Sequence, residues 1–121
     1  IINPVIVENQ VDLGLTMAMG WMLTEEYLID SRTGIIINPN LLDYKLQTFL
    51  DVPRENETLR IVVERPCAWG PFGAKGFSET AMTALGPAIT NAIYNAIGVR
   101  IYDGSLSPSN ILRAIERAKG R

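Results

Sequence analysis

The sequence predicts one α+β domain, in which short strands and helices form a two-layer arrangement. Helix-length apolar segments at residues 11–23 and 79–97 alternate with short β-branched segments, which are flanked by turn-forming residues. The chain has 121 residues, of which 47% are hydrophobic and 20% charged, enough for one packed core. No repeat or linker divides the sequence, so we expect residues 1–121 to form one unit.

The first apolar segment, residues 11–23, carries apolar side chains on almost every face of a helix. This pattern predicts an N-terminal helix that is buried all round. Gly14 and Gly20 each lower the helix propensity by about 1 kcal/mol relative to alanine. We therefore expect another element to pack closely against the helix backbone at these glycines.

Four short strands are predicted in addition to this helix. Residues 27–40 read as a strand, a turn at 30–34 and a second strand, because turn-forming residues precede three isoleucines and Asn-Pro-Asn follows them. Residues 59–64, LRIVVE, and residues 99–102, VRIY, are predicted to form further strands.

Two helices are predicted in the C-terminal half. Residues 79–97 have a long helical pattern that Gly98 ends and that Pro87 kinks or splits. The last helix is amphipathic, with Ser107 as its N-cap and Pro108 at its first position. Its expected buried stripe consists of Ile111, Ile115 and Ala118.

Composition excludes several classes of function. A net charge of −2 and a pI near 5.1 argue against a nucleic-acid-binding surface. The chain has no histidine and one cysteine, Cys67, so we expect no internal disulfide, no iron–sulfur cluster and no metal held by its own side chains. It shows neither a membrane-spanning apolar run nor a signal peptide, and we expect a cytoplasmic protein.

A glycine-rich loop at residues 70–79, GPFGAKGFSE, precedes the predicted long helix. Such a loop is a generic anion site, but its glycines lie three apart and match neither the P-loop nor the dinucleotide fingerprint. Locally, Ser78 is expected to cap the helix, and Glu79 in the first turn would complement the helix dipole by about 0.5–1 kcal/mol.

The order of several segments changes this interpretation. They resemble the C-terminal end of the large, molybdopterin-binding subunit of the xanthine dehydrogenase and aldehyde oxidoreductase family, over nearly the whole chain. The segments are IINP, QVDLGLTMAMGWMLTEE (10–26), DYK (43–45), GPFGAKGFSE (70–79), AITNAIYNAIGVRI (88–101) and SPSNILRAI (107–115).

This resemblance implies that residues 1–121 are the C-terminal part of a larger molybdenum-binding domain. In that family the glutamate matching Glu79 lies beside the molybdenum and is the general base, in the oxidation of an N-heterocycle or an aldehyde with water-derived oxygen. The resemblance also implies iron–sulfur clusters and FAD on partner domains or subunits, which carry the electrons away. The expected cofactor contacts are Gly76, Phe77, Ser78 and Met17.

Two positions depart from the family pattern. Ser78 stands where the family usually has glycine, and its side chain would crowd the cofactor or add a hydrogen bond to it. Met17 stands where the family usually has a glutamine that contacts the pterin side, and methionine cannot donate that hydrogen bond.

Two other readings remain open from the sequence. The chain could be a non-catalytic split or truncated fragment that acts in subunit assembly, or a small anion-binding domain. In the enzymatic reading the cavity needs the remaining molybdopterin-binding segments, so we expect the isolated chain to be inactive, to expose apolar surface and to self-associate.

Overall fold

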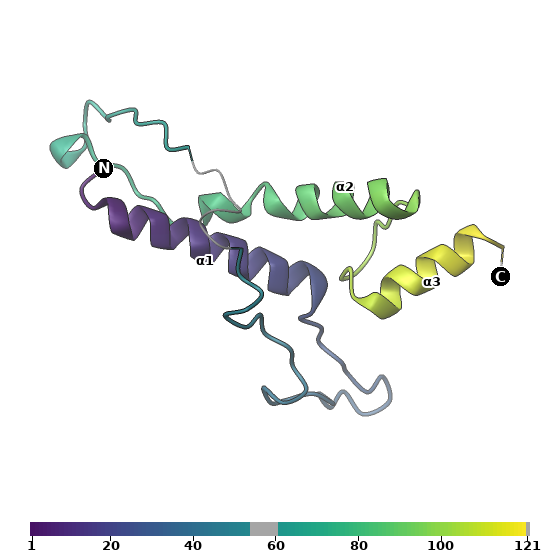
Figure 1. The fold of residues 1–121 in the computed structure, drawn as a ribbon. Coiled ribbons are helices and arrows are strands. Elements are labelled where there is room, and N and C mark those ends of the chain that lie inside the picture. Colours follow the sequence, from purple (N-terminus) through teal and green to yellow (C-terminus); the bar gives the residue numbers. More distant parts are fainter. Residues whose placement is uncertain (54–60, 121) are drawn as a thin grey trace.

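The computed structural model describes residues 1–53 and 61–120, which form three α-helices and two short 3₁₀ turns (Figure 1). Helices α1 and α2 lie side by side, and α3 lies beyond the end of α1 (Figure 1). The elements are, in order, α1 (Pro4–Leu23), η2 (Pro71–Gly73), η3 (Glu79–Met82), α2 (Leu85–Ile97) and α3 (Pro108–Ala118).

The α+β prediction is wrong, because the described residues contain no sheet. Their β-structure is one isolated antiparallel bridge between Ile29 and Ile36. The predicted turn at 30–34 is confirmed, and it closes a narrow hairpin through hydrogen bonds such as that from Ile37 N to Leu28 O at 2.7 Å. A lone hairpin with no third strand stays short.

The other two predicted strands are also wrong as far as the structure describes them. Residues 61–64 and 99–102 run as irregular chain without strand pairing, while residues 59 and 60 lie outside the described part. Their β-branched composition favours strands only where a neighbouring strand supplies hydrogen-bond partners, and none lies beside either segment in the described chain.

Helix α1 begins seven residues earlier than predicted. The Asn3 side chain caps it by accepting from Val5 N at 3.1 Å and Ile6 N at 3.4 Å, and Pro4 occupies the first helical position. The prediction that this helix is buried all round is wrong. Its buried residues are Gly14, Ala18 and Gly20, because other elements cover only part of its surface.

Close packing at Gly14 is confirmed. A Cβ placed on Gly14 would lie 2.9 Å from Ala81 Cβ and 3.1 Å from Met82 N, so η3 sits directly against the backbone of α1. Further along, a Cβ on Gly86 would lie 3.5 Å from Met22 Sδ. The two contacts show that α1 runs parallel to η3 and α2, as Figure 1 also shows.

The predicted helix at 79–97 is split, as Pro87 led us to expect. The break lies at residues 83 and 84, between η3 and α2, and Pro87 falls in the first turn of α2. A proline ring clashes with the carbonyl four residues earlier, here that of Thr83, which therefore cannot belong to the same helix. Gly98 ends α2 with φ of 71°, as predicted.

Helix α3 begins at Pro108 with Ser107 at the N-cap position, as predicted. The Ser107 hydroxyl does not bond the helix end and instead lies 3.2 Å from Ser109 Oγ. Within the expected buried stripe, Ile111 and Ile115 are half-buried and Ala118 is exposed. No helix in the described ranges is long and apolar enough to cross a membrane.

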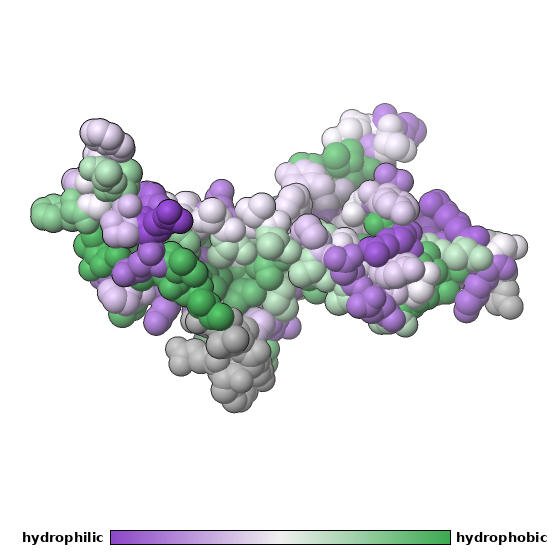
Figure 2. Space-filling view, turned by 90° about the horizontal axis from the view of Figure 1, so that it is seen from above, coloured by the Kyte–Doolittle hydropathy of each residue, from purple (hydrophilic) through white to green (hydrophobic). Residues whose placement is uncertain are grey.

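Apolar side chains are unevenly distributed over the surface. Figure 2 shows deep green, hydrophobic patches over the half that carries the N-terminus and the glycine-rich loop, and more hydrophilic surface around α3. The buried hydrophobic side chains of the described chain are Ala18 and Leu106, each 1% exposed. Most of its large apolar side chains are therefore not covered by the chain itself.

Candidate active site

Glu79 is the first residue of η3, at the point where η3 meets α1. Its side chain is exposed and makes no hydrogen bond or ion pair with the part of the chain that the structure describes. Ser78 precedes it at the N-cap position with φ of −141° and ψ of −113°, and makes no capping hydrogen bond. The predicted Ser78 cap is therefore wrong, because the serine backbone does not present the hydroxyl to the turn.

The glycine-rich loop folds on itself before it reaches Glu79. Cys67 N donates to Gly73 O at 2.9 Å, and a Cβ on Gly73, whose φ is 72°, would lie 3.0 Å from Pro66 Cβ. Gly73 is thus required both by its left-handed backbone and by the close approach of Pro66. The loop's first part is a fixed turn that delivers the following residues to η3.

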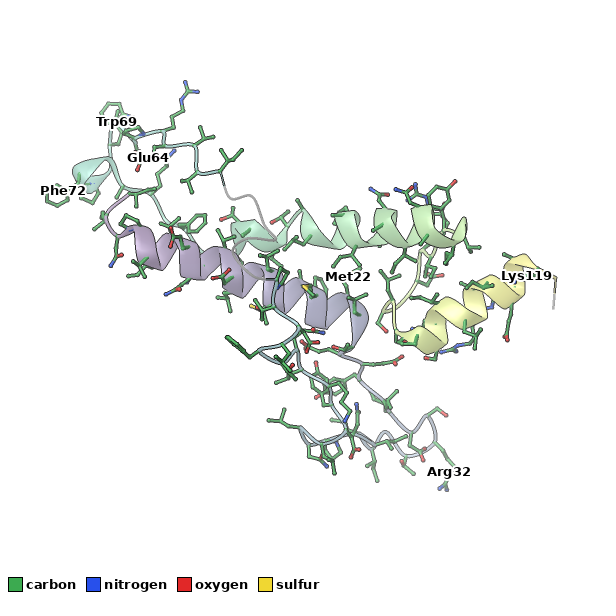
Figure 3. All side chains as sticks on the ribbon, in the orientation of Figure 1. Met22, Arg32, Glu64, Trp69, Phe72 and Lys119 are labelled. Atoms are coloured by element: carbon green, nitrogen blue, oxygen red, sulfur yellow. The ribbon has the colours of Figure 1, made fainter. Side chains whose placement is uncertain are left out.

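The tip of this loop presents two aromatic side chains to the outside. Trp69 is 95% exposed and Phe72 100% exposed, and both point away from the rest of the chain in Figure 3. Phe72 also has a φ of 55°, in the left-handed region that a non-glycine residue rarely adopts. Fully exposed aromatic rings on a strained turn are typical of a surface that packs against another part of a larger assembly.

Gly76 differs from the glycines before it. A Cβ placed on Gly76 would meet no atom within 4 Å, and its φ is not positive. Neither packing nor backbone conformation within the described residues therefore requires glycine at this position. Together with exposed Phe77 and Ser78, it borders open space immediately before Glu79.

Met17, the remaining predicted cofactor contact, lies on α1 one turn beyond Gly14 and is 39% exposed. The contact between Gly14 and Ala81 brings its helix against the turn that starts with Glu79. Glu79 and Met17 thus lie on two elements that contact each other, although they are far apart in sequence.

Sequence reasoning missed one residue, Gln10. Its Oε1 atom is buried and has no hydrogen-bond partner among the described residues. Gln10 lies one turn before Gly14 on α1, and Gly14 packs against Ala81 of η3. A buried acceptor without a donor is costly unless a group from outside supplies one. Its neighbours Glu8, Asn9 and Asp12 are polar too, so the local sequence does not single it out.

Two ionisable groups in residues 27–44 have shifted pKa values. Tyr44 Oη donates to Glu25 Oε2 at 2.8 Å, and this hydrogen bond raises the pKa of Tyr44. Backbone N–H groups of Arg32 and Thr33 lower the pKa of Asp30. No group of three cysteine or carboxylate side chains that could hold a metal ion occurs within residues 1–53 and 61–120.

The junction of α1 and η3 is suited to a bulky polar ligand. The open space at Gly76 leaves room for such a group, and Gln10 Oε1 offers an acceptor that no described donor fills. The exposed carboxylate of Glu79 lies at the same junction. The residues present therefore fit a large cofactor that is held mainly by other segments.

Comparison with known proteins shows which family the chain resembles. The family described as the molybdopterin cofactor-binding domain matches residues 1–53. The xanthine dehydrogenase molybdenum-binding subunit of Escherichia coli O157:H7 is 38% identical over 111 residues, which are 92% of this chain and 14% of the relative. The aldehyde oxidoreductase molybdenum-binding subunit of Escherichia coli K12 is 33% identical over 93% of this chain and 15% of its own length.

A solved structure shares the arrangement of the whole chain. Quinoline 2-oxidoreductase from Pseudomonas putida 86 superposes with a TM-score of 0.81 and 35% identity, over 96% of this chain and 15% of that protein. The 121 residues thus span about a seventh of the length of the proteins they match. The chain belongs to the xanthine dehydrogenase and aldehyde oxidoreductase family, in which it corresponds to part of the molybdenum-binding subunit.

Proposed function

We propose that this chain is part of a molybdenum hydroxylase in which Glu79 is the general base. The carrying observation is the exposed Glu79 carboxylate, which has no partner in the described chain and follows three exposed residues that also leave room for another group. A base must have its carboxylate accessible to the proton it removes, and a carboxylate tied into an ion pair or a cap would be a poorer acceptor.

The cofactor in this proposal is the molybdenum–molybdopterin group, shared with segments outside these residues. Gly76, Phe77, Ser78 and Met17 would line it, and Gln10 Oε1 would accept a hydrogen bond from it. When bound, the cofactor supplies the two-electron redox chemistry of the reaction. Iron–sulfur clusters and FAD on partner domains or subunits would carry the electrons away.

Within this reaction the residues of the chain position and move a proton. A carboxylate oxygen of Glu79 accepts the proton of the water-derived hydroxyl that attacks the substrate carbon. The Ser78 hydroxyl, which makes no cap, is available to donate a hydrogen bond where family members have glycine. Met17 offers only packing, so the Ser78 hydroxyl and the Gln10 carbonyl are the chain's polar contacts.

The substrate class that best fits is an N-heterocycle or an aldehyde. The names of the matched proteins support this, since they include a xanthine dehydrogenase, an aldehyde oxidoreductase, a nicotine 6-hydroxylase and a quinoline 2-oxidoreductase. All these compounds offer an electron-poor carbon next to nitrogen or oxygen, which a water-derived oxygen can attack.

The test is Glu79→Gln in the full-length subunit, purified with its partner subunits. Turnover should fall by several orders of magnitude, because glutamine is isosteric but cannot accept the proton. Molybdenum content, measured by metal analysis, should stay at the wild-type level. Glu116→Gln on α3, an exposed glutamate outside the junction, is the control and should keep full activity.

Two results would count against the proposal. Wild-type turnover in Glu79→Gln would reject Glu79 as the base. Assembled wild-type subunits that contain neither molybdenum nor activity would instead support a role in subunit assembly.

A further inference from the structure

A concave region lies at the opposite end of the molecule from the glycine-rich loop (Figure 1). It is a groove of about 580 Å³ between residues 99–104 and α3. We call it the arginine groove, because Arg100, Arg113 and Arg117 line it. Val99, Ile101 and Ala114 contribute an apolar floor.

Two of the three guanidinium groups are held in place by neutral partners. Arg100 lies over the Tyr94 ring, with Cζ 3.9 Å from its centroid, and donates to Asn91 Oδ1 at 2.7 Å. Arg113 donates to Asn110 Oδ1 at 2.5 Å. Neutral partners fix the direction of a guanidinium without cancelling its charge, so both arginines are ordered and keep their positive charge for another ligand.

The acidic residue of the groove leaves most of this charge uncompensated. Asp103 is the carboxylate among the lining residues, and it forms no ion pair with a described residue. Three guanidinium groups and one carboxylate give the lining a formal charge of 3 − 1 = +2. A groove with this charge attracts carboxylates, which bind guanidinium groups through two parallel hydrogen bonds.

The shape of the groove favours an extended polypeptide over a small anion. Arg113 and Arg117 lie four residues apart on α3, on successive turns of the helix, so they can contact side chains spaced along a strand-like segment. An apolar floor between charged rims is typical of a protein contact. The chain spans only 14% of its relative, so a subunit of that length has ample further polypeptide that could supply such a segment.

We propose that the arginine groove docks an acidic segment from the rest of the molybdenum-binding subunit. This inference rests on the family membership and on the groove, and it does not depend on Glu79. In this proposal, α3 and residues 99–104 bind another part of the subunit through charge, at a site separate from the junction of α1 and η3.

The first test uses the double variant Arg113→Gln/Arg117→Gln in the full-length subunit, assembled with its partners. Amide hydrogen exchange across residues 99–118 should become about tenfold faster, because each lost charge-assisted hydrogen bond weakens docking. Arg113→Lys/Arg117→Lys should restore most of the protection. Arg32→Gln, at the exposed tip of the hairpin (Figure 3), is the matched control and should change nothing in these residues. Unchanged exchange in the double glutamine variant would overturn the proposal.

The second test identifies the occupant. A photoreactive p-benzoylphenylalanine in place of Tyr102, a groove residue that is 87% exposed, should crosslink to a peptide rich in Asp and Glu from the same subunit. A crosslink to a partner subunit, to a second copy of these residues or to a segment without carboxylates would refute the proposal. So would competition of the crosslink by millimolar inorganic phosphate at constant ionic strength, which would identify a small-anion site.

Discussion

Polar groups are hydrogen-bonded within the hairpin at residues 27–40, whereas at the junction around Glu79 some lack a partner in the described chain. In the hairpin, Asn38 is only 5% exposed, accepts from Leu28 N at 3.0 Å and donates to Glu26 O at 2.7 Å. At the junction, Ser78 makes no cap, and Gln10 Oε1 is buried without a donor in the described chain. A segment that satisfies its own hydrogen bonds is scaffold, whereas one that leaves groups open is shaped for contact with something else.

The largest effect on the scaffold side of this comparison should come from Asn38→Ala. The substitution removes two part-buried hydrogen bonds and takes the acceptor from Leu28 N, so we expect a loss of about 2 kcal/mol in local stability. Hydrogen exchange of residues 26–40 in the assembled enzyme measures it. Asn40→Ala, whose side chain caps an exposed turn, should cost clearly less. Equal losses would mean that burial of Asn38 does not hold the hairpin together.

An intermediate effect is expected where α1 meets η3. Gly14→Ala adds a Cβ 2.9 Å from Ala81 Cβ, which forces the two elements apart and should cost about 1 to 2 kcal/mol. Because Glu79 starts η3, the rate of substrate oxidation should fall as well.

Gly86→Ala, where α1 meets α2, is the matched control for this contact. Its Cβ would lie 3.5 Å from Met22 Sδ, an ordinary contact, and alanine favours the helix, so stability should stay equal or rise slightly. Thermal unfolding and activity of both variants give the answer. If Gly14→Ala were as stable and active as Gly86→Ala, tight packing would not position Glu79.

The smallest effect concerns the pH dependence of the hairpin. Backbone hydrogen bonds from Arg32 and Thr33 lower the pKa of Asp30 in the folded hairpin. A lowered folded-state pKa gives stability that is fully present above the ordinary carboxyl pKa and is lost as the pH falls through the folded value. Protection of residues 30–35 should therefore decline below about pH 4. Asp30→Asn should abolish this decline, and an unchanged pH profile in that variant would contradict the assignment.

Local signals predicted the individual elements better than their assembly. Pro108 marked the start of α3, Gly98 marked the end of α2, and Gly14 marked a close contact, because each depends on the backbone of a few residues. The absence of a sheet from the described residues could not be predicted, because a β-branched segment such as 99–102 becomes a strand only if a neighbour pairs with it.

The candidate site, too, could be predicted only in part from local sequence. The local pattern predicted only that Glu79 starts a helix, and its proposed role as base came from the ordered resemblance to a family. Gln10 escaped notice because an unpaired acceptor becomes visible only when the burial of its oxygen is known. Sites completed by distant or external groups leave little trace in local sequence.

The hydrogen bond from Leu106 N to Met22 O, at 2.7 Å, has a consequence for biosynthesis. Met22 carries one of the last carbonyls of α1, which the helix itself cannot satisfy. Leu106 follows α1 in the chain, so during synthesis α1 emerges before the residue that completes its C-terminal end. The last turn of α1 is therefore completed only after Leu106 has been made, and a nascent chain halted before Leu106 would carry an α1 with an unsatisfied carbonyl at its C-terminal end.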